Sequence, residues 1–326
     1  MTTTPAPPIT VVGESVADAF VTSDGDDSAT LTVHAGGGPA NTAVALARLG
    51  TPARFLGRLS AGPLGSLMRR RLTASGVDLS GAVTTTAPAT LAIAQLDSTG
   101  SAAYDFYAEG TADWRWTRQE LAAALGGGTT PACVHSGSLA LALPPGGPLI
   151  EEALTRARET STICIDPNVR PSLVDLDEVR ERLPDWCRLA DILRLSSEDA
   201  ELLMPGAGPD EAARRLMDHG AGLVVITCGA QGALGYSATG RLHVPVPEVK
   251  VVDTVGAGDS FTAGLLHRLA TDGLLGGRLD GLRDEQLWSA LEFAASVAAR
   301  TCEVAGPNPP YAADLRSGRG GVERSG

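Results

Sequence analysis

The residues best suited to chemistry lie in one nonapeptide, D-T-V-G-A-G-D-S-F, at positions 253–261. Its glycines precede an apolar-periodic segment that predicts a helix, so backbone N–H groups at the helix start could converge on an anion. Asp259 stands at the head of that helix, where its carboxylate could accept the proton of an attacking hydroxyl. The loop therefore favours phosphoryl transfer, with a base and an anion hole together. Taken alone, Gly-Ala-Gly-Asp could equally be a tight turn with a helix cap.

Two better-known phosphate loops are excluded. No Lys-Ser or Lys-Thr follows the glycines, as a Walker A loop requires. A nicotinamide-dependent oxidoreductase needs G-x-G-x-x-G after its first strand, and here that strand ends in Gly13-Glu14-Ser15. If the glycine loop at 253–261 binds phosphate, it must therefore belong to a different class of phosphate-binding loop.

Composition narrows the class of protein further. The chain has 26 Lys and Arg against 38 Asp and Glu, a net charge of −12, so it offers no basic surface for nucleic acid or anionic lipid. Its five cysteines are scattered, without a C-x-x-C pair or a His at metal-ligand spacing, which suits a reducing compartment. Neither a secretion leader nor a stretch of 18 apolar residues is found. We expect a cytoplasmic protein that binds neither membranes nor nucleic acid.

The elements that must position these groups show two different patterns of secondary structure along the chain. Early in the chain, β-favouring stretches form two hairpins, one around a turn at 23–28 and one around D-S-T-G-S at 97–101. From residue 132 onward, short apolar strands alternate with helical segments, which predicts a parallel sheet. Strands are predicted at 9–12, 15–22, 29–34, 90–96, 103–108, 133–135, 163–165, 192–195 and 223–227, and helices at 40–49, 64–74, 149–158, 176–189, 209–219, 259–270 and 284–300.

The predicted fold class is α/β. We expect a three-layer, doubly wound, mostly parallel sheet in a single domain over residues 1–326, with a small β-strand lid formed by about 14–35 and 89–110. Residues 1–8 and 316–326 have the composition of disordered ends. Open hairpins expose strand edges and an apolar face, so we also predict a homodimer through the lid.

Further motifs occur in the order of a known family. They are G-G-G-P-A-N at 36–41, D-P-N-V-R at 166–170, T-C-G-A-Q-G at 227–232 and the nonapeptide, with Gly13, Glu14 and Asp18 at the start. Together they span about residues 9–310, and their agreement is far more specific than any single loop. The chain resembles the ribokinase-like (PfkB) carbohydrate kinases, closest in motif form to the fructokinase and 2-keto-3-deoxygluconate kinase branches.

The resemblance implies a role for each motif. Asp259 is implied as the general base, with the N–H groups of Gly256, Ala257 and Gly258 as the anion hole. Substrate contacts are implied for Asp18, Gly36, Gly37, Gly38, Asn41, Tyr107, Arg170 and Asp253. ATP contacts are implied for Ser196, Thr227, Gly229, Gly232, Gly258 and Asn308. Carboxylates and amides suit polyol recognition and a guanidinium suits an anion. By residue type alone, however, Asp18, Asn41 and Arg170 could equally be ordinary surface or helix residues.

The expected cofactors are ATP and Mg²⁺, with K⁺ as an additional candidate. The family's N-x-x-E motif appears only as S-S-E-D at 196–199, so Asp199 takes the place of the Glu. Asp199 would then contact Mg²⁺ through water, because this ion keeps most of its hydration shell. Asp253 corresponds to a family position near a monovalent-cation site, although it could instead stabilise a turn.

The predicted function is ATP-dependent phosphorylation of a sugar or sugar-acid hydroxyl. A ribokinase or nucleoside kinase stays open, since these enzymes differ in the substrate pocket rather than in the catalytic machinery. A sugar or nucleotide sensor that keeps the fold without turnover is the remaining alternative, and the intact Asp259 argues against it.

Overall fold

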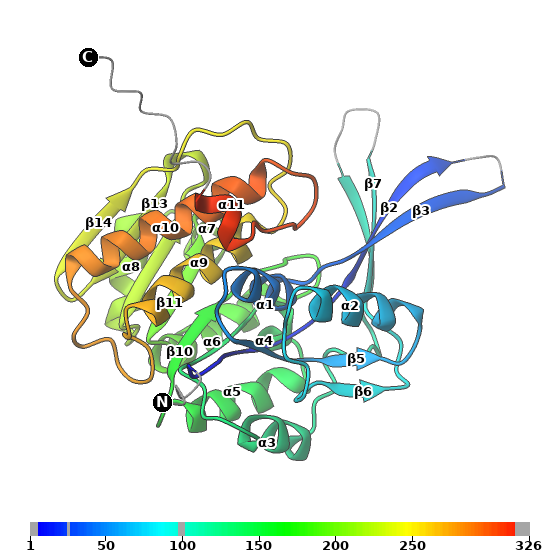
Figure 1. The fold of residues 1–326 in the computed structure, drawn as a ribbon, viewed down its shortest axis with the longest axis horizontal. Helices are drawn as coiled ribbons and strands as arrows, with labels where there is room; N and C mark the ends of the chain where they lie inside the picture. Colours follow the sequence, from blue (N-terminus) through cyan, green and yellow to red (C-terminus); the bar gives the residue numbers. More distant parts are fainter. Residues whose placement is uncertain (1–5, 25–26, 97–101, 317–326) are drawn as a thin grey trace.

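The computed structural model describes residues 6–24, 27–96 and 102–316 (Figure 1). Its centre is an eight-stranded sheet in the order β14-β13-β12-β11-β10-β9-β1-β4, parallel from β12 to β4, with β13 and β14 added antiparallel. The strands are β1 (Ile9–Val12), β4 (Ala53–Leu56), β9 (Cys133–Gly137), β10 (Thr162–Asp166), β11 (Ile192–Ser196), β12 (Leu223–Thr227), β13 (Ala233–Ser237) and β14 (Gly240–Val244).

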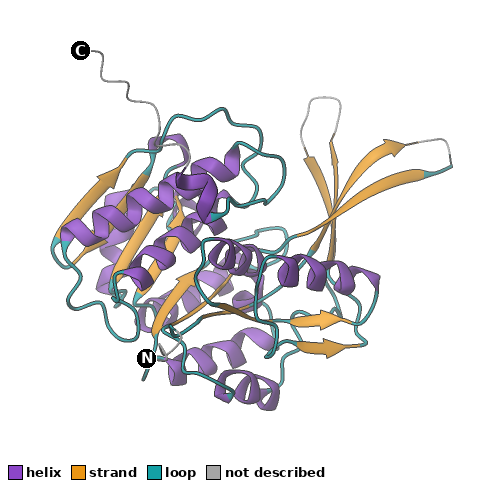
Figure 2. Cartoon of the chain, in the orientation of Figure 1, coloured by secondary structure: helices purple, strands orange, loops and turns teal. Residues whose placement is uncertain are grey.

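Helices cover both faces of this sheet, which gives three layers (Figure 2). Successive strand residues alternate between the two cores: Cys133 and Cys164 face one side, and Val134 and Ile163 the other. The first side packs against α1 (Gly38–Arg48), α2 (Pro63–Ala74), α9 (Ala257–Thr271) and α10 (Asp284–Cys302). The second packs against α3 (Arg118–Gly126), α4 (Ser138–Ala142), α5 (Gly146–Ala157), α6 (Leu176–Leu189), α7 (Ser197–Leu203) and α8 (Pro209–Asp218).

A separate four-stranded sheet projects from the body at the upper right of Figure 1. Its order is β3-β2-β7-β8, with β2 and β7 parallel and the outer pairs antiparallel. The strands are β2 (Ala17–Asp24), β3 (Ala29–Ala35), β7 (Leu91–Leu96) and β8 (Ala102–Tyr107). The two predicted hairpins thus form a single sheet. A two-stranded sheet, β5 (Arg58–Ser60) and β6 (Val83–Thr85), lies beside α2.

The predicted fold class is confirmed, and most predicted elements match within a few residues. Elements that the patterns did not predict include β4 to β6, α3, α4, α7, the antiparallel pair β13 and β14, and two short pieces, η1 (Gly229–Gln231) and α11 (Ala312–Arg316). The turn predicted at 97–101 and part of the one at 23–28 lie outside the described residues, as do 1–5 and 317–326 of the predicted disordered ends. None of the helices in the described part of the chain has the length and apolar content that a membrane span requires.

Candidate active site

The parallel strands place their carboxyl ends along one edge of the sheet, and a cavity of about 760 Å³ lies there. Ligands of open α/β sheets bind at this edge, because the loops that follow the strands converge on it. Its walls come from the strand ends, the start of α1, the loop before α9 and one face of the four-stranded sheet. The lining residues include Glu14, Asp18, Phe20, Gly37, Gly38, Asn41, Phe106, Ser138, Asn168, Arg170, Arg194, Gly256, Gly258 and Asp259.

Asp259 lies in this cavity in the first turn of α9. Its Oδ2 accepts a hydrogen bond of 2.8 Å from Nδ2 of Asn41, in the first turn of α1. Burial raises the pKa of Asp259 to about 6, and the neighbouring charge of Asp166 adds to the rise, while the Asn41 bond and the cations Arg194 and Arg170 oppose it. The carboxylate is therefore ionised at neutral pH and has a proton affinity closer to the working range than that of an exposed Asp.

The loop before Asp259 presents backbone to the cavity. Gly256 has φ 77°, in the left-handed region that favours glycine, and a Cβ there would lie 2.8 Å from Cβ of Pro307. The N–H of Ala257 donates to O of Thr254 at 3.2 Å. Among the hydrogen bonds of the described residues, none uses the N–H groups of Gly256 or Gly258. The structure thus leaves two of the three expected anion-hole donors open at a helix N-terminus.

A buried ion pair lies directly beneath this loop. Nη1 of Arg194, on β11, donates to Oδ2 of Asp166 at 2.8 Å, and its Nη2 donates to Oγ1 of Thr227 at 2.6 Å. Both charged side chains are less than a tenth exposed. A Cβ on Gly258 would lie 2.9 Å from Nη1 of Arg194, so the guanidinium packs against the helix start. A cation here adds to the positive end of the α9 dipole and favours an anion above it.

One face of the four-stranded sheet forms the opposite wall. Asp18 pairs with Ala92 on β7, and Ala92 pairs with Phe106 on β8, so these three residues share a row across the strands. All three line the cavity. Burial raises the pKa of Asp18 to about 6, with Asp259 adding to the rise and Arg71 opposing it. Tyr107, which the sequence suggested for this wall, is 56% exposed and is not among the cavity residues.

Several polar residues of the cavity were given no role by the sequence analysis, although Glu14 and Asn168 belong to motifs that it named. Glu14 accepts a hydrogen bond of 3.1 Å from the N–H of Ala140, and burial raises its pKa to about 7. Ser138 and Asn168 both have positive φ, 53° and 40°, and Nδ2 of Asn168 lies 3.5 Å from Oγ of Ser138. Strained backbone that persists at a cavity indicates a functional constraint. These residues follow β1, β9 and β10, where each strand ends.

The residues predicted to contact ATP lie apart from the cavity, except for Gly258. Thr227 ends β12, and the turn from Gly229 to Gly232 follows it. Ser196 caps α7, with its Oγ donating to Oδ2 of Asp199 at 2.7 Å. Asn308 is exposed and accepts a hydrogen bond from Arg48.

The two carboxylates that the sequence suggested for metal contacts accept hydrogen bonds from the backbone. Asp199 accepts from the N–H of Val169 at 2.8 Å and from the N–H of Ser196 at 3.1 Å. Asp253 joins two loops by accepting from the N–H groups of Val255, at 3.0 Å, and Gly306, at 2.8 Å. In the described residues no group of three acidic, His or Cys side chains could hold a metal ion by itself.

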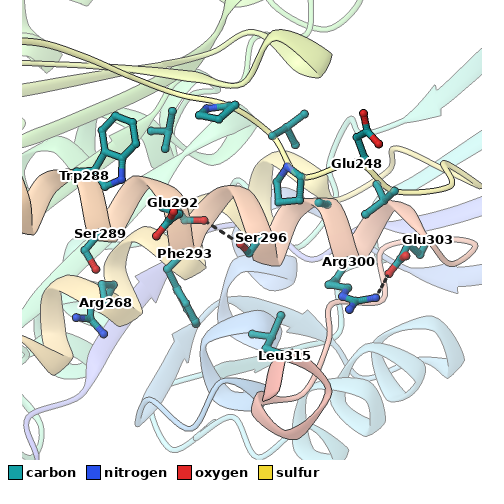
Figure 3. Close-up of a pocket in the computed structure, with 16 residues that line it drawn as sticks. Glu248, Arg268, Trp288, Ser289, Glu292, Phe293, Ser296, Arg300, Glu303 and Leu315 are labelled. Carbon is teal, nitrogen blue, oxygen red and sulfur yellow. Dashed lines mark hydrogen bonds and ion pairs between the residues drawn. The ribbon is translucent and has the colours of Figure 1, made fainter. Parts of the chain in front are cut away.

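Figure 3 shows a second pocket, between the 244–249 loop and the outer face of α10. Glu248, Glu292 and Glu303 line it, with an Arg300–Glu303 ion pair of 2.8 Å. Arg268 and Arg300 line it as well, and Asp259 is not among the lining residues. The predicted base thus lies in the cavity beside α9 and not in this second pocket.

Gly38 gives a direct test of this geometry. A Cβ at Gly38 would lie 3.0 Å from Nδ2 of Asn168 and 3.2 Å from Oδ1 of Asp259, so an alanine must displace one of them by a few tenths of an ångström. We expect Gly38→Ala to lower kcat/KM roughly tenfold or more, because reacting groups tolerate little misplacement. Steady-state kinetics measure this. The control is Gly281→Ala, whose Cβ would meet nothing within 4 Å; equal activity of both variants would contradict the prediction.

The sequence and the fold match those of known carbohydrate kinases. The pfkB family carbohydrate kinase profile matches residues 7–313. A fructokinase of Rhizobium leguminosarum bv. trifolii is 39% identical over 254 residues, 78% of this chain and 77% of the relative. A Xylella fastidiosa fructokinase structure with bound ATP is 26% identical at a TM-score of 0.83, covering 95% of this chain and 97% of that one. A Vibrio cholerae O395 fructokinase structure with fructose, ADP and calcium is 26% identical at a TM-score of 0.82. That match covers 96% of this chain and 98% of the other chain.

The chain therefore belongs to the pfkB family of carbohydrate kinases, as the sequence motifs predicted. It is an ATP-dependent sugar kinase, a transferase with an alcohol group as acceptor.

Proposed function

We propose that the chain transfers the terminal phosphoryl group of ATP to a hydroxyl of fructose, with Asp259 as the general base. The observation that supports this most directly is the carboxylate of Asp259 in a polar cavity of about 760 Å³, next to the open N–H groups of Gly256 and Gly258. The curated and structural relatives named above are fructokinases. Asp18, Asn41 and the backbone of Gly36, Gly37 and Gly38 would hold the sugar.

The proposed reaction breaks one bond and forms one. The acceptor oxygen bonds to the γ-phosphorus as the bond to the β,γ-bridging oxygen breaks, and ADP leaves. Asp259 takes the hydroxyl proton and returns it to solvent after product release. The N–H groups of Gly256 and Gly258, the α9 dipole and Arg194 stabilise charge on the transferring group. Thr227, Gly229, Gly232, Ser196 and Asn308 would lie along the nucleotide.

Mg²⁺ is the proposed divalent ion. Because Mg²⁺ keeps several waters and binds substrate phosphates, nucleotide phosphates and water would supply most of its ligands. Asp199 has both oxygens engaged in hydrogen bonds, whereas Oδ1 of the buried Asp166 has no partner in the described part of the chain. Either carboxylate would reach the ion through water. When bound, the ion would neutralise phosphate charge. We propose that K⁺ binds at the two loops that Asp253 joins through its hydrogen bonds to Val255 and Gly306.

The proposed assembly is a cytoplasmic homodimer through the lid, the sheet β3-β2-β7-β8. Leu31 on β3 is 41% exposed, and β3 and β8 are the outer strands of that sheet. Such edges are commonly covered by a second copy. Five free cysteines fit a reducing compartment. Light scattering that finds only monomer at micromolar concentration would argue against the dimer.

Arg170 supports a second candidate substrate, a sugar acid such as 2-keto-3-deoxygluconate. The side chain lines the cavity, and the bond found for its guanidinium goes to the backbone O of Val169 at 3.1 Å. A substrate carboxylate would pair with it bidentately.

An ADP-release screen tests the proposal. Fructose, 2-keto-3-deoxygluconate, ribose and nucleosides are compared with ATP and Mg²⁺, with and without K⁺. We expect fructose to give the highest kcat/KM. A preference for the sugar acid that Arg170→Gln abolishes would favour the second candidate, and a preference for ribose or a nucleoside would exclude both.

A further inference from the structure

Helix α2 carries three consecutive arginines, and the third contacts the residue that binds Asp259. Nη1 of Arg71 donates to Oδ1 of Asn41 at 2.7 Å, and its Nη2 donates to the backbone O of Pro307. Arg69 instead donates to the backbone at Leu59 and Ser60, and Arg70 is exposed. A chain of hydrogen bonds thus runs from Pro307 through Arg71 and Asn41 to Asp259.

This chain fixes which way the amide of Asn41 points. An arginine has only donors, so the amide group next to Arg71 must be the oxygen. The nitrogen of Asn41 must then face Asp259, where it donates to Oδ2 at 2.8 Å. With Oδ2 occupied, Oδ1 is the oxygen left for the acceptor hydroxyl. Oδ1 is also the oxygen that approaches Gly38 at the cavity wall.

The constraint matters most during the reaction. An ionised Asp259 holds the amide nitrogen of Asn41 by itself, because a carboxylate only accepts. The proton that Asp259 takes from the substrate arrives on Oδ1, so Oδ2 still accepts from the amide nitrogen of Asn41. Only if the proton moved to Oδ2 could a flipped Asn41 accept a hydrogen bond from it. Arg71 removes that alternative, since the flipped amide would point its NH₂ group at the guanidinium.

The charge of Arg71 persists at neutral pH. Burial lowers the pKa of Arg71 to about 10, and Arg48 on α1 lowers it further, while Asp259 and Asp18 raise it. The guanidinium therefore remains a cation that interacts electrostatically with both the proposed base and the proposed sugar-binding carboxylate. It also secures Pro307, which packs against Gly256 of the anion-hole loop.

We propose that Arg71 is a positioning residue for phosphoryl transfer, which locks the amide of Asn41 so that Asp259 presents Oδ1 to the acceptor hydroxyl. The inference rests on the proposed role of Asp259 as general base. It concerns kcat rather than substrate capture, because Arg71 itself does not line the cavity.

The test compares kcat and KM among variants of the full chain. Arg71→Met should lower kcat about 10- to 100-fold, the range expected for a lost hydrogen bond to a charged group, with the KM for ATP changed less than about twofold. Arg71→Lys, which is also donor-only, should recover kcat to within about fivefold of the unmodified chain. The matched control is Arg70→Met, the same substitution one residue earlier on the exposed face, and it should leave kcat unchanged.

A double-mutant cycle identifies the route of action. If Arg71 acts through Asn41, then adding Arg71→Met to Asn41→Ala should lower kcat by less than about threefold. Full additivity would overturn the proposal. Should Arg71→Met fail to fold, Arg71→Gln replaces it. Glutamine fills much of the space but allows either orientation of the Asn41 amide, so the kcat of Arg71→Gln should fall below that of Arg71→Lys. Equal kcat values for these two variants would refute the proposed role of Arg71 in fixing that amide. An active Asp259→Asn would show that the proposed function has failed, whereas an inactive Asp259→Asn with a fully active Arg71→Met would refute only the present inference.

Discussion

Asp259→Asn should lower kcat about 10²- to 10⁴-fold, the usual worth of a general base. The asparagine fills the same space and keeps an oxygen that can accept from Asn41, so the loop and the ATP site should stay intact. ADP production measures kcat, and calorimetric titration with ATP checks binding. Near-normal turnover in this variant would remove Asp259 from the chemistry, and lost ATP binding would indicate a disrupted loop instead.

The same substitution should not destabilise the protein. The pKa of Asp259 rises from 3.8 to about 6 on folding, so near pH 8 the fold bears the cost of an ionised carboxylate there, up to about 3 kcal/mol. Asparagine removes this cost, so the melting temperature of the Asp259→Asn protein should equal or exceed that of the unmodified chain. Such a gain in stability with lost activity is typical of a group held for function.

The pH profile of the unmodified enzyme follows from the same shift. A base works only when deprotonated, so kcat/KM should be full above pH 7 and fall as pH drops through about 6. Asp18 has its pKa raised to about 6 as well, so two carboxylates take up protons in one window. The acid limb should therefore be steeper than a single titration, and in Asp18→Asn it should approach a slope of one.

Residues whose role depends on local sequence can be identified from the sequence alone. The glycines and Asp259 of the nonapeptide lie within one helix start, and Asn41 lies one turn into α1, so motif and periodicity sufficed to place them. The parallel sheet followed from apolar strands that alternate with helices, and the observed sheet has an apolar core on each face.

Residues whose role depends on distant contacts were missed. Tyr107 and Phe106 are neighbours on β8, and only the pairing of Phe106 with Ala92 decides which of them faces the cavity. Arg71 stands in a run of three arginines, and the packing of α2 against α1 and Pro307 selects it. Helical spacing from Leu67 and Met68 places Arg71 on the apolar face of α2, but the local sequence does not reveal its partners.

The buried ion pair of Arg194 is indicated by the sequence of its strand. Arg194 is the one charged residue in the strand I-L-R-L-S, where buried aliphatic residues flank it on both sides. A buried arginine requires a carboxylate partner, and the parallel neighbour β10 ends in Asp166. The pair could therefore have been predicted if β10 and β11, consecutive strands of a parallel sheet, were taken as neighbours, although its position under Gly258 could not.

Arg194→Met should cost about 3–5 kcal/mol, because it leaves Asp166 buried without its partner. With an unfolding entropy of about 0.7 kcal/mol/K for a chain of this length, the melting temperature should fall by roughly 4 to 7 °C. The matched control, Arg188→Met, breaks the exposed Asp185–Arg188 pair on α6, and exposed pairs contribute about 0–1 kcal/mol. Thermal melts near pH 8 measure both variants.

The dependence of this loss on pH separates charge from packing. Burial raises the pKa of Asp166 while Arg194 opposes the rise, so removing the guanidinium should raise that pKa further. The folded Arg194→Met protein then binds a proton more tightly than the unfolded chain, and its deficit should shrink between pH 8 and pH 5 as Asp166 becomes neutral. Adding Asp166→Asn should restore most of the stability at pH 8. A deficit that stays constant with pH and persists in the double variant would mean that Arg194 stabilises the loop through its packing against Gly258 and Phe261, rather than through charge.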